Sequence, residues 1–186
     1  HIFLYASMTV DLGDDALKAL GGRSRWGVTP SDPMGTTMRR IDRGQGGNRI
    51  ITRTCATFDP RMEATEAALR RSAAVHRVKF EERFPQLKGV RMEYTWAGHL
   101  CLSKNAVSVM KPLDDGLFAA CVCNGLGTTR STLTGIGAAE LASDTASDIT
   151  RHFLAEPEPS RLPPPPFSTI GANLYLRWKE WRAAAE

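Results

Sequence analysis

The sequence predicts an α+β fold, in which helices pack against a mainly antiparallel sheet. Two observations carry this prediction. Residues 36–41 and 49–54 are β-like and flank a glycine-rich turn, a pattern typical of a β-hairpin. Residues 60–84 then repeat apolar side chains at three- and four-residue spacing, which indicates an amphipathic helix. A hydrophobic content of 42% and a charged content of 24% are usual for a globular chain and argue against wholesale disorder of the 186 residues.

The first elements are short. Residues 1–6 have the apolar character of a buried strand, and they lack an initiator methionine, a cationic leader region and a cleavage motif. We therefore expect a fragment or a processed chain whose N-terminal part is carried elsewhere. Residues 14–20 predict a helix that ends at Gly21 and Gly22. Residues 23–35, rich in Gly, Pro, Ser and Asp, predict a loop.

The long helix has a signal at each end. Asp59 can cap its N-terminus, and Pro60 suits its first turn. Pro85 ends it. His76 lies on the apolar stripe, where a lone histidine is more often a hydrogen-bonded core residue than a catalytic base. The sequence therefore identifies no catalytic residue.

The second half of the chain alternates strands and helices. The predicted strands are residues 90–102, 106–110 and 117–123, with a turn at 114–116. A glycine loop then opens a helix that runs to about Ala142, and residues 156–166 form an extended, proline-rich connector. A last amphipathic helix at residues 171–185 places Leu174, Trp178 and Trp181 on one side, where we expect them to pack into the core.

Charge and cysteine spacing disfavour several classes of protein. The net charge is +4 and the basic residues are dispersed, whereas nucleic-acid binding needs clustered positive charge. No run of 18 apolar residues occurs, so no membrane span is expected. The four cysteines have neither zinc-site nor C-x-x-C spacing, and no metal site is predicted. We expect them to be small buried side chains in a reduced, cytoplasmic protein.

The most distinctive motif is the glycine loop Asn124-Gly125-Leu126-Gly127-Thr128-Thr129-Arg130, between a predicted strand and a predicted helix. It imitates a dinucleotide-binding fingerprint, but Arg130 replaces the third glycine and no second parallel strand with an acidic end follows. Free backbone N–H groups at a helix start favour an electron-rich or anionic ligand atom, and glycine lets that atom approach. From the residues alone, a plain tight turn is an equally good interpretation.

The order of the motifs resembles the C-terminal signature of the D-amino-acid-oxidase-like (DAO) family of FAD-dependent oxidoreductases, in the gamma-glutamylputrescine-oxidase-like branch. The core of the signature is a W-x-G element, a G-x-G loop and a helix glycine, here Trp96-Ala97-Gly98, Gly125-Leu126-Gly127 and Gly135. Three flanking segments fit the same order: Met38-Arg39-Arg40-Ile41, Pro85-Gln86-Leu87 and Arg161-Leu162-Pro163-Pro164.

The resemblance implies that residues 1–120 form mainly a DAO-type substrate domain, and that residues 121–186 return into the FAD-binding domain and end in a tail helix. It implies FAD as the cofactor, with these residues beside the isoalloxazine ring: Asn124, Gly125, Leu126, Gly127, Thr128, Trp96 and Gly98. Arg40 would bind a substrate carboxylate in bidentate fashion, or serve only as a structural hairpin arginine. His99 is a second substrate-binding candidate, although strand alternation turns it away from Gly98.

This sequence departs from the family pattern in three places. The G-x-G-x-x-G segment that holds the ADP moiety of FAD is absent from these residues, and the usual D-x-x-P appears as Asn105-Ala106-Val107-Ser108. The aromatic residue expected before the strand arginine is Met38 or Arg39. We therefore expect that this chain alone does not bind FAD tightly, and that a missing N-terminal segment or another chain completes it.

Two classes of function follow from the resemblance. The first is the C-terminal fragment of an amine or amino-acid oxidase, in which a hydride passes from the carbon bearing the nitrogen to the flavin, the imine hydrolyses and oxygen reoxidises the flavin. Its substrate would be a small amine or amino acid. The second is a non-catalytic, degenerate DAO-like domain that acts as a binding or interaction module. In either case the helices that belong to the missing domain should expose apolar surface, which predicts self-association.

Overall fold

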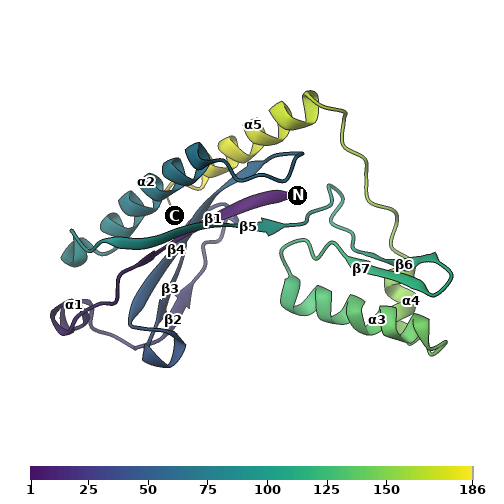
Figure 1. Cartoon of the computed structure of the whole chain (residues 1–186), viewed down its shortest axis with the longest axis horizontal. Helices are drawn as coiled ribbons and strands as arrows, with labels where there is room; N and C mark the ends of the chain where they lie inside the picture. Colours follow the sequence, from purple (N-terminus) through teal and green to yellow (C-terminus); the bar gives the residue numbers. More distant parts are fainter. Residues whose placement is uncertain (186) are drawn as a thin grey trace. The chain divides into compact units, whose positions relative to one another are not determined.

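The chain folds into two units in a computed structural model that describes residues 1–185. The sheet unit comprises Phe3–His99 and Thr169–Glu186, and the hairpin unit comprises His1–Ile2 and Leu100–Ser168. The glycine loop therefore shares a unit with the hairpin before it, whereas the last helix belongs with the sheet (Figure 1).

The sheet unit is built on five strands in the order β2-β3-β4-β1-β5. Their bounds are β1 Ile2–Thr9, β2 Trp26–Val28, β3 Thr37–Ile41, β4 Arg49–Phe58 and β5 Met92–Leu100. β3 pairs with β2 and with β4 in antiparallel fashion. Side-chain contacts from Ser7 to Thr95 and from Phe3 to His99 show that β1 and β5 also run antiparallel. The sheet is thus mainly antiparallel, as the sequence predicts.

Three helices accompany the sheet: α1 Asp14–Leu20, α2 Glu66–Arg83 and α5 Phe167–Arg182, with the short 3₁₀ turns η1 Arg43–Gln45 and η2 Pro85–Leu87. α2 and α5 lie over the same face of the sheet (Figure 1). α5 is fixed to β4 by hydrogen bonds, because Glu180 accepts from the amide of Ala56 and Asn173 accepts from the amide of Phe58. We call this the covered face of the sheet, and the opposite one the open face.

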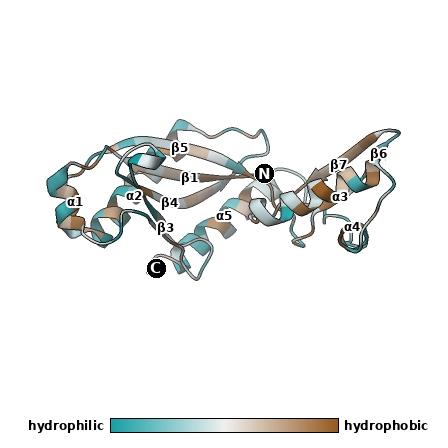
Figure 2. Cartoon of the chain, turned by 90° about the horizontal axis from the view of Figure 1, so that it is seen from below, coloured by the Kyte–Doolittle hydropathy of each residue, from teal (hydrophilic) through white to brown (hydrophobic). Residues whose placement is uncertain are grey.

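The core of the sheet unit lies between the covered face and α2. One cluster of buried apolar residues contains Leu12, Met38, Ile50, Phe80, Phe84 and Leu87, and a second contains Phe3, Tyr5 and Cys55. Figure 2 shows hydrophobic residues concentrated along β1, whose side chains enter the second cluster. Burying a side chain such as Phe80 contributes about 1.5–3 kcal/mol, so these clusters hold α2 on the sheet.

The hairpin unit consists of β6 Val109–Asp114, β7 Leu117–Cys121, a π-helical turn η3 Gly127–Ser131, α3 Thr132–Ala142 and α4 Asp148–Leu154. β6 and β7 form an antiparallel two-stranded sheet that α3 covers. Gly137 makes this packing close, because a Cβ there would meet Met110 Sδ at 2.2 Å. Over the part of the chain that the structure describes, no helix is long and apolar enough to cross a membrane.

Several predicted elements are confirmed. α1 has the predicted bounds and ends at Gly21, whose φ is 60°. The hairpin of β3 and β4, the end of α2 before Pro85 and the turn between β6 and β7 are also present. The extended segment at 156–166 contains no helix or strand.

Other boundaries were wrong for identifiable reasons. α2 begins at Glu66 rather than Pro60, since Asp59 accepts from the amide of Arg61 to form a turn and Met62 has a φ of 61°. The side chain of Thr65 caps the helix instead. The predicted strand at 106–110 is displaced to β6, because Ala106 has a φ of 58°, outside the β region. The short elements β2 and α4 were not predicted.

The predictions for the aromatic side chains of α5 and for the cysteines also need correction. Leu174, Trp178 and Trp181 do not pack into the core; their exposed fractions are 66%, 46% and 72%. The helix instead turns the polar residues Asn173 and Glu180 towards β4. Of the cysteines, which are all free thiols, Cys55 is buried as expected but Cys121 is exposed.

Candidate functional site

The two faces of the sheet differ in chemistry. On the covered face, the imidazole of His76 lies between strands: its Nδ1 is 2.7 Å from Ser7 Oγ, and its Nε2 is 3.1 Å from the carbonyl oxygen of Thr54. Ser7 Oγ in turn lies 2.9 Å from Thr95 Oγ1. This network joins α2 to β1, β4 and β5. The prediction that His76 is a hydrogen-bonded core residue is therefore confirmed.

His76 is fully buried, and burial lowers the pKa of its imidazole below the ordinary value. The hydrogen bond to Thr54 opposes this effect, and the positive charge of Arg71 adds to it. The imidazole is therefore neutral at physiological pH. Its Nε2 is within hydrogen-bonding distance of both the backbone N–H and the carbonyl oxygen of Thr54, and its Nδ1 pairs with the Ser7 hydroxyl, which can donate or accept. A neutral histidine that is enclosed in this way is suited to a structural role.

The open face carries the W-x-G element. Trp96 is 40% exposed, and its neighbour on the same face, Tyr94, is 51% exposed. Alternation along β5 puts Gly98 on this face as well, and a Cβ at Gly98 would meet no atom within 4 Å. The guanidinium of Arg49, which is bonded to Glu93, lies 5.7 Å from the centre of the Tyr94 ring. The indole of Trp96 therefore offers a flat apolar surface, and the absence of a side chain at Gly98 leaves free space beside it.

The two predicted substrate-binding residues lie away from this face. Arg40 is buried on the covered face, and its Nη1 donates to the carbonyl of Gly21 at 2.5 Å. This contact agrees with the alternative that Arg40 is a structural arginine of the hairpin. The ring of His99 lies 4.3 Å from that of Phe3, on the side of Ala97, as alternation predicts. Neither side chain is on the same face as Trp96.

A different arginine, Arg53, lies on the open face. It pairs across the strands with Thr37 and donates to Thr37 Oγ1 at 2.8 Å. Burial lowers the pKa of its guanidinium. Sequence reasoning missed it, although alternation along β4 could have found it, because Ile50 and Thr52 face the core and Arg53 must face the other way.

The glycine loop has the conformation that its sequence implies. Gly125 has a φ of 81°, and a Cβ there would meet only Leu100 Cδ2, at 4.0 Å. Leu126 is 57% exposed and Thr128 is exposed. Within residues 1–185, the amides of Gly125, Gly127 and Thr128 donate to no other group. Three free N–H groups lie just before or at the first turn of the helix, where the helix dipole favours negative charge.

The side chain of Asn124 is used within the protein. Its Oδ1 accepts from the amide of Ser103, and its Nδ2 donates to the carbonyl of Val107. It therefore ties the glycine loop to residues 103–107, and only its backbone is left for a ligand. Its φ of 51° lies in the left-handed region, which asparagine tolerates better than most residues.

Arg130, which replaces the third glycine of a dinucleotide fingerprint, turns back towards the same segment. It donates to the carbonyl of Ala106 at 2.9 Å and to Ser108 Oγ at 3.0 Å, and pairs with Glu156 at 3.4 Å. A long, tethered side chain occupies the position where a fingerprint needs close packing of helix on strand. The interpretation of this loop as a pyrophosphate site is thereby weakened further.

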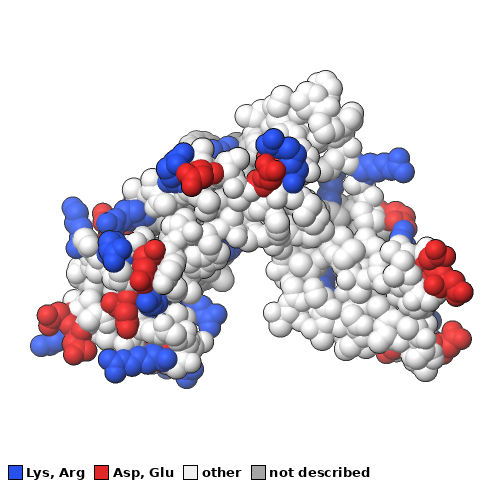
Figure 3. Space-filling view, in the orientation of Figure 1, with Lys and Arg blue, Asp and Glu red and all other residues white. Residues whose placement is uncertain are grey.

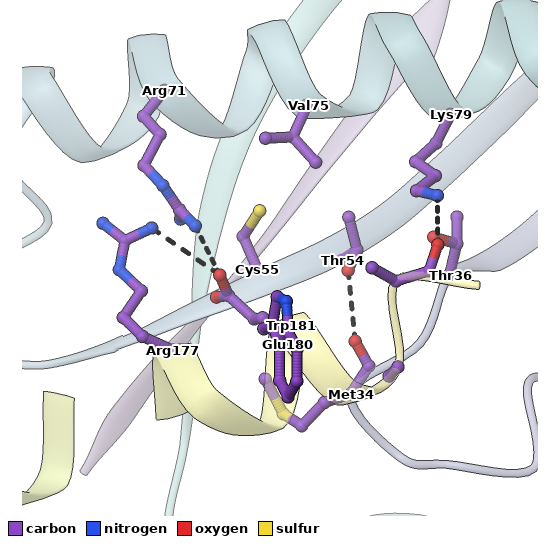
Figure 4. A pocket seen from close by; sticks show the side chains of 12 residues that line it. Met34, Thr36, Thr54, Cys55, Arg71, Val75, Lys79, Arg177, Glu180 and Trp181 are labelled. Carbon is purple, nitrogen blue, oxygen red and sulfur yellow. Dashed lines mark hydrogen bonds and ion pairs between the residues drawn. The ribbon is translucent and has the colours of Figure 1, made fainter. Parts of the chain in front are cut away.

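A cavity of about 320 Å³ lies under α5 on the covered face (Figure 4). Arg71 and Arg177 converge there on the carboxylate of Glu180, which also accepts from the amide of Ala56. Burial raises the pKa of the Cys55 thiol at its wall, so this cysteine is a poor nucleophile. The charged groups thus serve to attach α5 to the sheet.

Within the described residues, no group of three or more His, Cys, Asp or Glu side chains could hold a metal ion. No protein-family model matches the chain, and no curated protein matches it.

Proposed function

We propose that this chain supplies the substrate-facing part of an FAD-dependent amine or amino-acid oxidase of the DAO type. The observation that carries the proposal is the ordered pair of motifs: a W-x-G strand with Trp96 and Gly98 on an open sheet face, and a G-x-G loop with free amides at the start of a helix. An antiparallel sheet covered by helices on one face supports it, since the other face is left for a ligand.

The residues fit the isoalloxazine ring better than they fit the rest of FAD. Gly125 and Gly127 leave open space at the loop, and their amides have no acceptor among the described residues. These are the features required beside an electron-rich ring edge. The 186 residues contain no G-x-G-x-x-G segment for the pyrophosphate. In this proposal, the ADP moiety is therefore held by residues outside this stretch.

A bound flavin would supply the redox chemistry by accepting a hydride from the carbon that bears the substrate nitrogen. The protein's own contribution is orientation and electrostatics. The amides of Gly125, Gly127 and Thr128 would donate to negative charge on the ring.

The colour of the purified protein tests this proposal. A product that contains these residues together with an FAD-binding segment should be yellow, and its flavin band should bleach when an amine substrate is added without oxygen. A colourless product that FAD cannot reconstitute would refute the oxidase assignment. The 186 residues alone should be colourless. Stoichiometric flavin bound to them would contradict the proposal that residues outside this stretch hold the ADP moiety.

A matched pair of glycine substitutions tests the loop. A Cβ at Gly127 would meet only Cys123 Sγ, at 3.9 Å, so Gly127→Ala should fold normally. It would nevertheless put a methyl group beside the free amides and should weaken flavin binding at least tenfold. Gly135→Ala, on α3 with no atom within 4 Å of its Cβ, is the control and should bind flavin like the parent. Equal flavin affinity in both variants would show that the glycine loop is not part of the flavin site.

The alternative, a non-catalytic interaction module, is favoured by one observation. α5 exposes a stripe of large apolar side chains, namely Phe167, Ile170, Leu174, Tyr175, Trp178 and Trp181. In Figure 3 the surface over the first half of α5 carries almost no charged atoms. Exposed apolar patches mark interaction surfaces. The two functions are distinguished by the flavin experiment, because an interaction module alone would remain colourless in every context.

A further inference from the structure

The helix α5 is amphipathic, and its apolar side faces away from the sheet. Asn173 and Glu180 bond to β4, and Figure 4 shows Glu180 extending from α5 towards Arg71. The opposite side of the helix exposes a row of residues that we call the α5 stripe, namely Phe167, Ile170, Gly171, Leu174, Tyr175, Trp178 and Trp181. A surface helix normally turns its apolar side inwards, so this reversed arrangement indicates that another surface covers the stripe.

The α5 stripe is large enough for a stable interface. Its four aromatic side chains have exposed fractions between 46% and 72%. An aromatic side chain buries about 150–250 Å² when it is enclosed, so these four rings together offer roughly 400–600 Å². With Leu174 and Ile170 added, the total reaches the lower part of the roughly 600–1,000 Å² that each partner contributes to a standard interface.

The charges beside the stripe favour an antiparallel second copy of α5. Among the exposed positions of Phe167–Arg182, only Arg177 and Arg182 are charged, and both lie in the C-terminal half of the helix. Figure 3 shows almost no charged atoms over the first half. A parallel pair would bring the arginines of the two copies together. An antiparallel pair places them beside the uncharged half of the other helix, and it also opposes the two helix dipoles.

The stripe is complementary to itself when two antiparallel copies overlap in full. The middle of α5 lies between Leu174 and Tyr175, and a two-fold axis there sets Gly171 of one copy opposite Trp178 of the other. No described atom lies within 4 Å of a Cβ built at Gly171, so an indole can approach the backbone closely. The indole of Trp178 is held between the ring of Tyr175, at 5.9 Å, and the guanidinium of Arg182, at 4.9 Å. Each copy thus offers one positioned ring and one gap.

We propose that α5 forms a symmetric dimer interface, in which α5 of a second copy of this chain lies antiparallel along the stripe. Trp178 of each copy is seated over Gly171 of the other. Tryptophan, tyrosine and arginine, which surround this contact, are the residues enriched at the centres of interfaces. The polar side of α5 stays bonded to β4, so each copy keeps its own fold. The interface uses neither the open face of the sheet nor the glycine loop, and it goes beyond the proposed oxidase function without depending on it.

Sedimentation equilibrium of the 186-residue chain tests the interface. The parent should fit a monomer–dimer equilibrium without larger species. Gly171→Leu fills the gap opposite Trp178 and should weaken the dimer at least tenfold, although it adds apolar surface. A stripe that associates only through its general hydrophobicity predicts the opposite result, a stronger association.

The matched control is Gly135→Leu. Gly135 is also an exposed helix glycine with no described atom within 4 Å of its Cβ, but it lies on α3. This variant should dimerise like the parent. Both leucine variants should melt at or above the parent temperature, because leucine favours a helix over glycine.

An exchange of the two residues tests the register. Trp178→Ala removes the ring and Gly171→Trp fills the gap, so each single variant should weaken the dimer at least tenfold. In an antiparallel pair the double variant again sets a ring opposite a small residue, and its association should return to within about threefold of the parent. In a parallel pair position 171 would meet position 171, and the exchange would restore nothing.

Four results would each overturn the proposal: a parent that stays monomeric at high concentration, stronger association of Gly171→Leu, a Trp178→Ala variant that dimerises like the parent, or a double variant no better than its single variants. A monomeric product that contains these residues together with an FAD-binding segment would also overturn it, because that segment would then cover the stripe. A dimer with the expected variant effects, in a protein that never binds flavin, would uphold the interface and refute only the oxidase function.

Discussion

The buried imidazole of His76 should make the stability of the sheet unit fall when the pH is lowered from 7.5 to 5.5. In the unfolded chain the imidazole takes up a proton with a pKa of about 6.5. In the folded protein burial lowers the pKa, so the folded state resists protonation. The stability that the neutral imidazole contributes is therefore fully present above about pH 7.5, and it is lost progressively as the pH falls below about 6.5 towards the lower pKa of the folded state.

The size of the effect follows from these two states. If the folded imidazole stays neutral down to pH 5.5, the unfolded state gains about 1.4 kcal/mol relative to the folded state between pH 7.5 and 5.5. Carboxylates contribute little in this window. The pKa values of Asp32, Asp59 and Glu140 are lowered by hydrogen bonds, so their contributions are lost only below about pH 4.5.

Urea unfolding at the two pH values, followed by tryptophan fluorescence, measures the effect. His76→Gln is the reference, because the glutamine amide can still donate to Thr54 but does not titrate. The variant should lose about 1–3 kcal/mol at pH 7.5, since the buried hydroxyl of Ser7 loses its imidazole partner. Its remaining pH dependence should be smaller than that of the parent by about 1.4 kcal/mol.

Identical pH dependence in parent and variant would refute this account of His76. If the variant does not fold, an NMR titration of the parent decides the question. An imidazole of the folded chain that titrates near 6.5 and is assigned to His76 would show that burial does not control its protonation.

Three further changes have predictable outcomes. Gly137→Ala should destabilise the hairpin unit by about 1–3 kcal/mol through the clash with Met110, while Gly135→Ala should stabilise it by about 0.5–1 kcal/mol, as differential scanning calorimetry would show. Glu180→Gln should cost about 1–3 kcal/mol in urea unfolding, because the charge of Arg71 loses its counter-ion; an unchanged midpoint would mean that solvent replaces the pair. The exposed stripe on α5 should cause self-association, which Trp181→Gln should weaken in size-exclusion chromatography without lowering the melting temperature; a parent that stays monomeric at high concentration would contradict this.

Local signals in the sequence predicted local structure well. α1 was predicted to the residue, because Gly21-Gly22 at its end is a strong stop signal. The hairpin of β3 and β4 followed from a glycine-rich turn between β-like runs. The N-terminus of α2 could not be found in this way, because Thr65 and Asp59 are both good caps and only the backbone of Met62 decides between them.

The side that a helix turns inwards depended on tertiary contacts. Aromatic spacing on α5 predicts that Trp178 and Trp181 are buried, but the helix is held by Asn173 and Glu180. An irregular part of β4 makes this possible. Cys55 has a φ of 67°, and near it the amides of Ala56 and Phe58 donate to side chains of α5. Two side-chain acceptors on α5 satisfy those amides, and no residue pattern within α5 shows that they are needed.

Tertiary contacts also separate the roles of the arginines, which the sequence alone presents as equivalent. Met38-Arg39-Arg40-Ile41 offers two adjacent guanidinium groups, and the family resemblance draws attention to Arg40. Strand alternation sends Arg40 into the covered face and Arg39 into solvent, so neither is both desolvated and free. On the neighbouring strand, alternation and partial burial combine at Arg53 alone. The burial of each arginine thus follows from strand register, which the residue pattern of Met38-Arg39-Arg40-Ile41 does not show.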